Sequence, residues 1–192
     1  MKVAIIGKGN VGTAIARGLG NKHEVKFGHR DPKEPVNLAA KWGEIIILAV
    51  PFSVMADAAK AIGSAADGKP LLDCSNALTE EGDLAIGFTT SAAEELQKKL
   101  PKAHVAKAFN TVFAKNQSTG KVGKEQLTLF VAADDAQAKQ TVMRLGRDIG
   151  FDPVDAGPLK AARYLEPMGM LIINLGYGLG MGTGIGYKLA KG

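Results

Sequence analysis

The first 28 residues contain the feature that most limits how this chain can fold. Residues 3 to 12 read Val-Ala-Ile-Ile-Gly-Lys-Gly-Asn-Val-Gly, an apolar run that breaks directly into a Gly-x-Gly-x-x-Gly turn. A helical stretch, Thr13–Leu19, follows the turn, and a second apolar segment ends at Gly28. This order of strand, glycine turn, helix and second strand is typical of a dinucleotide-binding unit. The spacing also fits, because about 20 residues separate the first glycine from the end of the second strand.

Each glycine of this turn has its own physical role. Gly7 permits the tight bend, Gly9 lets the backbone approach a pyrophosphate, and Gly12 lets the helix pack close to the strand. The free N–H groups at the start of the helix then hold the phosphate charge. The predicted phosphate-binding residues are Gly7, Lys8, Gly9, Asn10, Val11 and Gly12.

The end of the second strand decides which dinucleotide is bound. An NAD site has an Asp or Glu there that accepts hydrogen bonds from the ribose 2′-OH, but this chain has Gly28 followed by His29 and Arg30. Arg30 can bind a 2′-phosphate through charge-assisted bonds worth about 1.5–3 kcal/mol each, which is about one to two decades of affinity. Asp31 precedes Pro32, which predicts a turn that directs its carboxylate elsewhere. We therefore predict NADP(H), with a solvated His29-Arg30 loop as the alternative.

Composition narrows the classes of protein. The chain has 192 residues, 46% of them hydrophobic, which fits one domain with a sizeable core. The net charge of +5 is scattered, without a basic run interleaved with aromatics, so we expect no nucleic-acid partner. One cysteine, Cys74, excludes an internal disulfide and fits a reducing compartment. With no signal peptide ahead of the first strand, the interpretation is a cytoplasmic protein.

One segment has to be tested against membranes. Residues 167–187 carry no charge, and a helix of this length would be long enough to cross a bilayer. Every second residue from Gly176 to Gly186 is glycine, however, and such a sequence forms a poor helix. We expect no membrane span but a buried helix over 161–177, followed by a glycine-rich loop. Because this apolar end has no capping domain, we also expect it to complete its burial in a homodimer.

Apolar runs alternate with helical patterns along the rest of the chain. This alternation predicts an α/β, Rossmann-like, doubly wound and mainly parallel sheet of seven or eight strands, in a single domain over 1–192. The predicted strands after the first two are 44–50, 70–73, 105–109, 127–132 and 153–155, and the predicted helices are 36–42, 54–62, 91–100, 135–149 and 161–177.

Ligands of such sheets bind outside the carboxyl ends of the strands. That rule selects the glycine turn and three further loops, 50–53, 74–77 and 110–113. The second loop offers an apolar wall to a bound ring, while Asn76 and Asn110 can bond the nicotinamide end, unless they satisfy their own backbone. The predicted cofactor-binding residues outside the turn are His29, Arg30, Ala49, Val50, Pro51, Phe52, Asn76, Ala77 and Asn110.

No side chain is an obvious proton donor. His23 and His104 fall at the amino ends of strands, and Lys107, inside a strand, is expected to point outward or snorkel rather than act as an acid. Cys74 is placed at a strand end but is expected to be a small buried hydrophobe. No metal-ligand spacing occurs in the sequence. We therefore assign no catalytic residue and no metal, and favour hydride transfer between two cofactors, which needs orientation more than acid catalysis.

With these motifs the sequence resembles the family of F420-dependent NADP reductases nearly end to end. The segments that carry the resemblance are Gly7-x-Gly9-x-x-Gly12, Gly28-His29-Arg30, Val50-Pro51, Ala108-Phe109-Asn110-Thr111, Asp155-Ala156-Gly157-Pro158-Leu159 and Leu165-Glu166-Pro167. The resemblance implies a small NADP(H)-binding domain whose segment 160–192 lines the pocket of a second redox substrate, such as the deazaflavin coenzyme F420. The acceptor-binding residues that it implies are Asn110, Thr111, Val112, Phe113 and Met168, near Leu171 and the 178–184 loop.

The sequence departs from the family at one loop. Members that use F420 carry a His where this chain has Asn110, and Phe113 replaces a small or cyclic residue. The acceptor therefore stays open between F420 and another small molecule, namely a flavin, quinone, imine or ferric complex. A non-catalytic NADPH sensor is the alternative from a different class. The resemblance does not fix the direction of the reaction.

Overall fold

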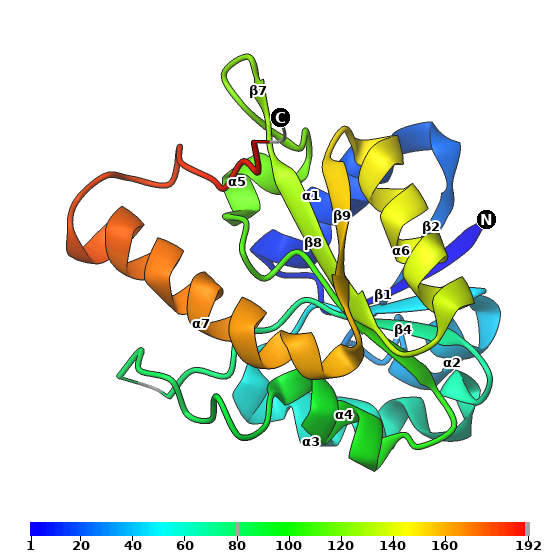
Figure 1. Cartoon of the computed structure of the whole chain (residues 1–192). Helices are drawn as coiled ribbons and strands as arrows, with labels where there is room; N and C mark the ends of the chain where they lie inside the picture. The colour runs from blue at the N-terminus through cyan, green and yellow to red at the C-terminus, as the bar shows by residue number, and fades with distance from the viewer. Residues whose placement is uncertain (80, 191–192) are drawn as a thin grey trace.

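The computed structural model describes residues 1–79 and 81–190, and its centre is a seven-stranded sheet with helices on both faces (Figure 1). The strand order is β2-β1-β3-β4-β5-β8-β9. The strands are β1 (Lys2–Ile6), β2 (Glu24–Gly28), β3 (Ile45–Leu48), β4 (Pro70–Asp73), β5 (His104–Lys107), β8 (Thr128–Ala133) and β9 (Asp152–Gly157), and a separate hairpin pairs β6 (Lys121–Val122) with β7 (Glu125–Gln126). The predicted α/β fold with a mainly parallel sheet is confirmed.

The helices form two layers. The helices are α1 (Asn10–Leu19), α2 (Val36–Trp42), α3 (Met55–Ile62), α4 (Ala92–Lys99), α5 (Ala114–Gln117), α6 (Ala136–Ile149) and α7 (Ala162–Ile173). One face of the sheet packs against α1 and α6, and the other packs against α2, α3 and α4 (Figure 1). The sheet is therefore covered on both faces, as near-continuous apolar strands require.

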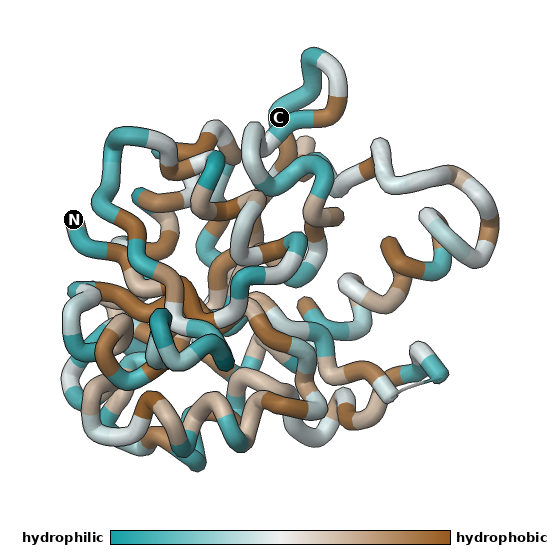
Figure 2. The backbone as a smooth tube through the Cα atoms, turned by 180° about the vertical axis from the view of Figure 1, so that it is seen from behind, coloured by the Kyte–Doolittle hydropathy of each residue, from teal (hydrophilic) through white to brown (hydrophobic). Residues whose placement is uncertain are grey.

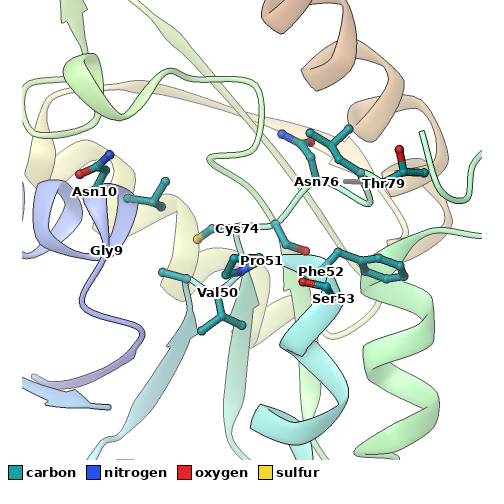
Figure 3. Close-up of a pocket in the computed structure, with 13 residues that line it drawn as sticks. Gly9, Asn10, Val50, Pro51, Phe52, Ser53, Cys74, Asn76 and Thr79 are labelled. Atoms are coloured by element: carbon teal, nitrogen blue, oxygen red, sulfur yellow. The ribbon is translucent and has the colours of Figure 1, made fainter. Parts of the chain in front are cut away.

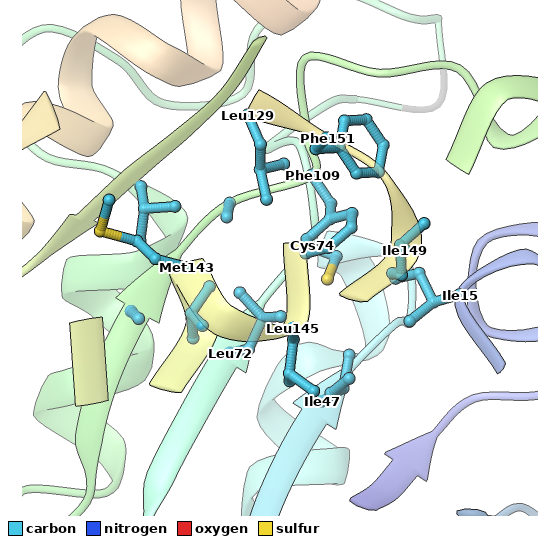
Figure 4. Close-up of a cluster of buried hydrophobic side chains, with 14 of the residues drawn as sticks. Ile15, Ile47, Leu72, Cys74, Phe109, Leu129, Met143, Leu145, Ile149 and Phe151 are labelled. Carbon is cyan, nitrogen blue, oxygen red and sulfur yellow. The ribbon is translucent and has the colours of Figure 1, made fainter. Parts of the chain in front are cut away.

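Alternate residues of the central strands divide the core between the two faces. In β1, Val3 and Ile5 pack toward α1 and α6, whereas Ala4 and Ile6 pack toward α2 and α3. The first of these clusters is drawn in Figure 4, where residues of α1 and α6 lie over β3 and β4. Because both faces are buried, strands such as β3 read as unbroken apolar runs.

The last two strands of the sheet run against the direction of the other five. β8 pairs antiparallel with β5, while β9 returns parallel to β8. A parallel crossover needs a connection that passes over the sheet, usually on a helix. The connection after β5 holds only the four-residue α5 and the β6–β7 hairpin, so the chain re-enters the sheet from the same edge. The amino end of β8 consequently lies at the carboxyl edge of the parallel strands.

Several element ends differ from the sequence predictions, and two of these differences follow from the local backbone. The predicted strand 105–109 ends at Lys107, because the chain turns at Phe109, which has a positive φ of 68°. The predicted helix 161–177 is α-helical only to Ile173, and a single π turn follows over Asn174–Gly178. That run, with glycines at 176 and 178, weakens continued α-helix.

The C-terminal segment returns to the sheet. α7 extends away from the sheet, and the chain after it comes back toward β8 (Figures 1 and 2). Thr128 N donates to the Tyr187 carbonyl at 2.9 Å, and Asn116 Nδ2 donates to the Thr183 carbonyl at 3.0 Å. These bonds fix the glycine-rich loop between two anchored ends. Among the described helices, none is long and apolar enough to cross a membrane.

A buried lysine joins the two central strands to α7. Lys107 Nζ lies 2.7 Å from Asp73 Oδ2 and 2.7 Å from Glu166 Oε1, and all three side chains are fully buried. Asp73 and Lys107 are register partners across β4 and β5. The expectation that Lys107 points outward or snorkels is therefore wrong, because two carboxylates compensate its buried charge.

The same group orders the nearby backbone. Lys107 Nζ donates to the Ser75 carbonyl at 2.7 Å, and Glu166 Oε2 accepts from Ala92 N at 3.0 Å, at the start of α4. Burial alone would lower the pKa of Lys107, but Asp73 and Glu166 outweigh it and raise that pKa. The ammonium therefore stabilises the fold at neutral pH, and this contribution is lost only as pH rises through the raised pKa.

Replacing Lys107 with Met tests this arrangement. The K107M variant leaves two carboxylates buried without a cation, and we expect it to lower the free energy of unfolding by about 3–5 kcal/mol. The control is K98M, because Lys98 makes a pair of the same 2.7 Å length with Glu95 but is 67% exposed. We expect K98M to cost less than about 1 kcal/mol. Urea denaturation measures both, and equal losses would contradict the structural role of the buried group.

Candidate functional site

Three cavities meet at the carboxyl edge of the sheet, and Gly9 lines all of them. The central cavity, about 580 Å³, is lined by Gly9, Asn10, Val11, Ala49, Val50, Pro51, Phe52, Ser53, Cys74, Ser75, Asn76, Leu78 and Thr79. The β2 cavity, about 660 Å³, lies between the glycine turn and the end of β2. The basic cavity, about 550 Å³, lies between α1, α5 and the C-terminal segment. This edge is where ligands of open α/β sheets bind.

The glycine turn has the geometry that a pyrophosphate needs. Gly7 has a φ of 109°, and its N–H donates to the Gly28 carbonyl at 3.0 Å. Gly9 is the N-cap of α1, and no side chain caps the helix there. A Cβ on Gly9 would meet no protein atom within 4 Å, whereas one on Gly12 would collide with the Gly7 carbonyl. The uncapped N–H groups therefore face open space, where an anion can approach them.

The β2 cavity holds the residues predicted to select the cofactor. Gly28, His29 and Arg30 line it, and both His29 and Arg30 are exposed to solvent. Asp31 accepts a hydrogen bond from Lys33 N at 2.9 Å, within its own turn. Its carboxylate is thereby used locally, as the Pro32 turn predicted, and a cation stands where an NAD site carries an acid.

The central cavity combines an apolar wall with a few polar groups. Figure 3 shows Val50, Pro51 and Phe52 on one side, with Gly9 and Asn10 facing them. Cys74 lies at its base, and its side chain is 6% exposed. Apolar walls with a small number of polar groups are typical of sites for planar rings.

The two predicted asparagines bond each other. Asn110 Nδ2 donates to Asn76 Oδ1 at 3.0 Å and to the Leu165 carbonyl at 2.7 Å, while Asn76 Nδ2 donates to the Asn110 carbonyl at 3.0 Å. Asn76 lines the central cavity, and Asn110 lies behind it, 6% exposed. Asn110 thus orients Asn76 and connects its loop to α7, so the pair orders the cavity wall.

The remaining predicted residues fall into two groups. Lys8, Asn10, Val11, Ala49 and Val50 line the cavities, whereas Ala77, Thr111 and Val112 are buried and line none of those described. Phe113 lines the basic cavity, with its ring centroid 5.5 Å from that of Tyr177. Met168 is half-buried and contributes its carbonyl, which accepts from the Tyr187 hydroxyl at 2.9 Å.

Sequence reasoning missed several cavity residues. Leu78 and Thr79 line the central cavity, and Arg17 and Lys115 line the basic cavity. Leu78 and Thr79 directly follow the predicted loop 74–77, which is a usable signal. Arg17 and Lys115 come from different helices, and nothing in the local sequence brings them together.

Among the described residues, the lining of the central cavity holds no Asp or Glu, and the carboxylate that lines a neighbouring cavity, Asp57, belongs to the β2 cavity. Burial raises the pKa of the Cys74 thiol well above its usual value, and Asp73 raises it further, so the thiol stays protonated and unreactive. The neighbouring Asp73 carboxylate is paired with Lys107, which also contacts Glu166. Within residues 1–79 and 81–190, no three His, Cys, Asp or Glu side chains are placed to hold a metal ion. The arrangement is suited to binding and orienting rings rather than to proton transfer by a side chain.

Comparison with known proteins agrees with this geometry. The family described as "NADP oxidoreductase coenzyme F420-dependent" matches residues 2–43, which include the glycine turn, β2 and Arg30. The F420-dependent NADP reductase of Methanocaldococcus jannaschii is 26% identical, over 91% of this chain and 92% of its own. A solved structure from Arthrobacter sp. FB24, provisionally named an F420-dependent NADP-reductase, is 28% identical and covers all of both chains with a TM-score of 0.92. The predicted resemblance to the F420-dependent NADP reductases is confirmed.

Another relative belongs to a different class of reductase. Metalloreductase STEAP3 of Rattus norvegicus is 30% identical over 186 residues, which is 90% of this chain. The chain spans only 37% of the length of that protein. Similar sequences therefore occur alone and as part of a longer protein.

Replacing Gly9 with Val separates binding from folding. The side chain of G9V would enter the point that the three cavities share, and we expect NADPH binding to be lost while the midpoint of thermal unfolding stays close to that of the unchanged chain. Gly12→Ala is the matched control, because its methyl group collides with backbone inside the protein and should lower that midpoint. Fluorescence titration with NADPH and a thermal melt measure the two effects. Retained NADPH affinity in G9V would show that the turn does not bind phosphate.

Proposed function

We propose that this chain is an NADP(H)-dependent oxidoreductase that transfers a hydride between the nicotinamide and a second redox cofactor, such as the deazaflavin coenzyme F420. The observation that carries the proposal is the uncapped start of α1 at Gly9, with Arg30 on one side and the apolar central cavity on the other. Arg30, the start of α1 and the central cavity follow one another in the same order as the 2′-phosphate, the pyrophosphate and the nicotinamide ring of NADP(H).

The residues fit the cofactor in charge as well as in shape. The first turn of α1 contains no acidic residue, so no side-chain charge opposes a pyrophosphate there. Lys8 is paired with Glu34 at 2.8 Å, at the border of the β2 cavity. Arg30 is left to meet the 2′-phosphate, and its fork of N–H donors suits a phosphate group.

The main role proposed for this chain in the reaction is to orient the nicotinamide ring and the acceptor. When bound, the nicotinamide would supply a hydride at its C4. Val50, Pro51 and Phe52 would support one face of the ring, and Asn76, held by Asn110, would hydrogen-bond its amide. The apolar wall would exclude water beside the reacting carbon. A proton needed by a deazaflavin or flavin ring nitrogen can come from solvent, which agrees with the lack of a side-chain acid.

The second substrate is proposed to bind beside the nicotinamide, next to the segment 160–192 of the same domain. Phe113 and Tyr177 lie there, and Tyr177 is 69% exposed. The alternatives are NADPH-dependent reduction of a flavin, quinone, imine or ferric complex, and NADPH sensing without turnover. The metalloreductase relative keeps the ferric complex among the acceptors to be tested.

We also propose a homodimer. Tyr164, Leu171, Tyr177, Leu179 and Met181 are more than half exposed on α7 and the loop that follows. Large exposed apolar side chains in one stretch of chain mark an interaction surface, and a second copy would bury them symmetrically. A hydrodynamic mass of one chain, 20.1 kDa, would contradict this part of the proposal.

Replacing Arg30 with Ala tests the choice of cofactor. We expect R30A to raise the KM for NADPH by roughly tenfold or more and to leave the KM for NADH unchanged, because only NADPH carries the 2′-phosphate. Lys33→Ala is the matched control, since Lys33 is an exposed cation of the same turn outside the β2 cavity. It should change neither value. An equal effect of R30A on both cofactors would refute the role of Arg30.

Mixing the protein with NADPH and F420 tests the reaction itself. We expect the deazaflavin absorbance to fall in stoichiometric proportion to the oxidation of NADPH. The same assay with FMN, a quinone, a cyclic imine and ferric citrate would identify a different acceptor. Tight NADPH binding without oxidation of NADPH by any of these acceptors would contradict the proposed enzymatic activity and favour the function of an NADPH sensor.

A further inference from the structure

The basic cavity lies beside the two cavities proposed for the dinucleotide. Of the three cavities that share Gly9, the β2 cavity is proposed for the adenosine end of NADP(H) and the central cavity for the nicotinamide end. A dinucleotide has only two ends. The basic cavity is a third branch, which leaves the glycine turn between α1 and α5.

The walls of this cavity are positively charged. Lys8, Arg17 and Lys115 line it, and within the described residues no Asp or Glu does. Lys8 is partly neutralised by Glu34. Arg17 and Lys115 are exposed at the cavity, one on α1 and the other on α5. Two cations that converge on one hollow without an acid in its lining favour an anionic ligand.

The cavity is held in shape by buried amide side chains. Asn116 Nδ2 donates to the Thr183 and Ile185 carbonyls at 3.0 and 3.1 Å. Gln117 Nε2 donates to the Phe109 and Val112 carbonyls at 3.2 and 2.9 Å. These bonds tie α5, the loop after β5 and the C-terminal segment into one wall. The position of Lys115 on α5 is therefore set by buried structure.

The basic cavity also adjoins the place proposed for the acceptor. It shares Gly9 and Asn10 with the central cavity, and Phe113 and Tyr177 form its aromatic side. A ring that lies against the nicotinamide could continue, through an attached chain, past these aromatic rings. The far end of that chain would then reach Arg17 and Lys115.

We propose that the basic cavity binds an anionic chain on the electron acceptor, a phosphate or carboxylate group attached to the redox ring, through Arg17 and Lys115. This inference rests on the proposed function and narrows it. Acceptors such as FMN and F420, which carry a phosphate on a flexible chain, fit the cavity. Uncharged quinones and imines would leave both cations without a partner.

Pairs of acceptors that differ only in the anionic chain test the inference. FMN is compared with riboflavin, and F420 with its deazaflavin core lacking the phosphate, by fluorescence titration of the protein saturated with NADP⁺. We expect the charged member of each pair to bind roughly tenfold more tightly or better. The preference should shrink as the salt concentration rises, because both cations are exposed.

The variants R17A and K115A locate the effect. Each should reduce the preference for the charged member severalfold and leave the affinity for NADPH unchanged. Arg144→Ala and Lys60→Ala are matched controls, since both are exposed cations on α6 and α3 outside the cavity, and they should leave the preference intact. A loss of NADPH affinity in R17A and K115A would overturn the inference, because the cavity would then serve the pyrophosphate.

Two further outcomes separate this inference from the proposed function. Equal binding of both members of each pair, with NADPH oxidation retained, would overturn the basic cavity as a subsite and leave the oxidoreductase standing. A preference for the charged members that R17A and K115A remove, without oxidation of NADPH by any acceptor, would support the subsite and contradict the enzyme.

Discussion

The buried contact of Lys107 with Asp73 and Glu166 is the interaction on which the site depends. Its three members come from β5, β4 and α7, so it fixes the first turns of α7 against the carboxyl edge of the sheet. The Leu165 carbonyl, one residue before Glu166, is thereby placed to accept from Asn110, which in turn orients Asn76. Because the ion group has no solvent around it, loss of Lys107 would leave two buried carboxylates without a cation. The geometry of the cavity wall therefore depends on an ion group that does not itself line the central cavity.

Local patterns predicted the first half of the fold because they are complete within a few residues. The backbone geometry of the glycine turn can be predicted from its own residues, since Gly7 has a positive φ and Gly12 has no room for a Cβ. The apolar runs of β1 and β3 are long enough to exclude exposed strands. The turn at Asp31 was likewise predicted from Pro32, and its carboxylate is used by Lys33 N. In each case the residues that determine the local structure are close in sequence to the residues whose structure they determine.

The features that sequence reasoning missed depend on distant partners. Lys107 is 34 residues from Asp73, and its correct environment follows only when β4 and β5 are placed in register. A signal was available, because Asp73, Lys107 and Glu166 each interrupt an apolar segment and their charges are complementary. The antiparallel direction of β8 follows from a connection that lacks a crossover helix. The joint lining of one cavity by Arg17 and Lys115 depends on how α1 and α5 pack, which no local pattern encodes.

The three cavities draw on different parts of the chain, and only the residues at and just before the start of α1 are common to the proposed cofactor and acceptor sides. The residues proposed to meet the phosphates and the ribose end lie within 7–30, inside the segment 2–43 that the family match covers. The basic cavity, proposed for the acceptor chain, is lined by Thr13, Ala14 and Arg17 inside that segment and by residues of 113–118, 177 and 183 outside it. Changes in these walls can therefore alter the acceptor without disturbing the dinucleotide, because the two sets of residues meet only at Lys8, Gly9 and Asn10. The acceptor is accordingly to be sought by the charge and shape of the cavity between α1 and α5, where Arg17 and Lys115 lie.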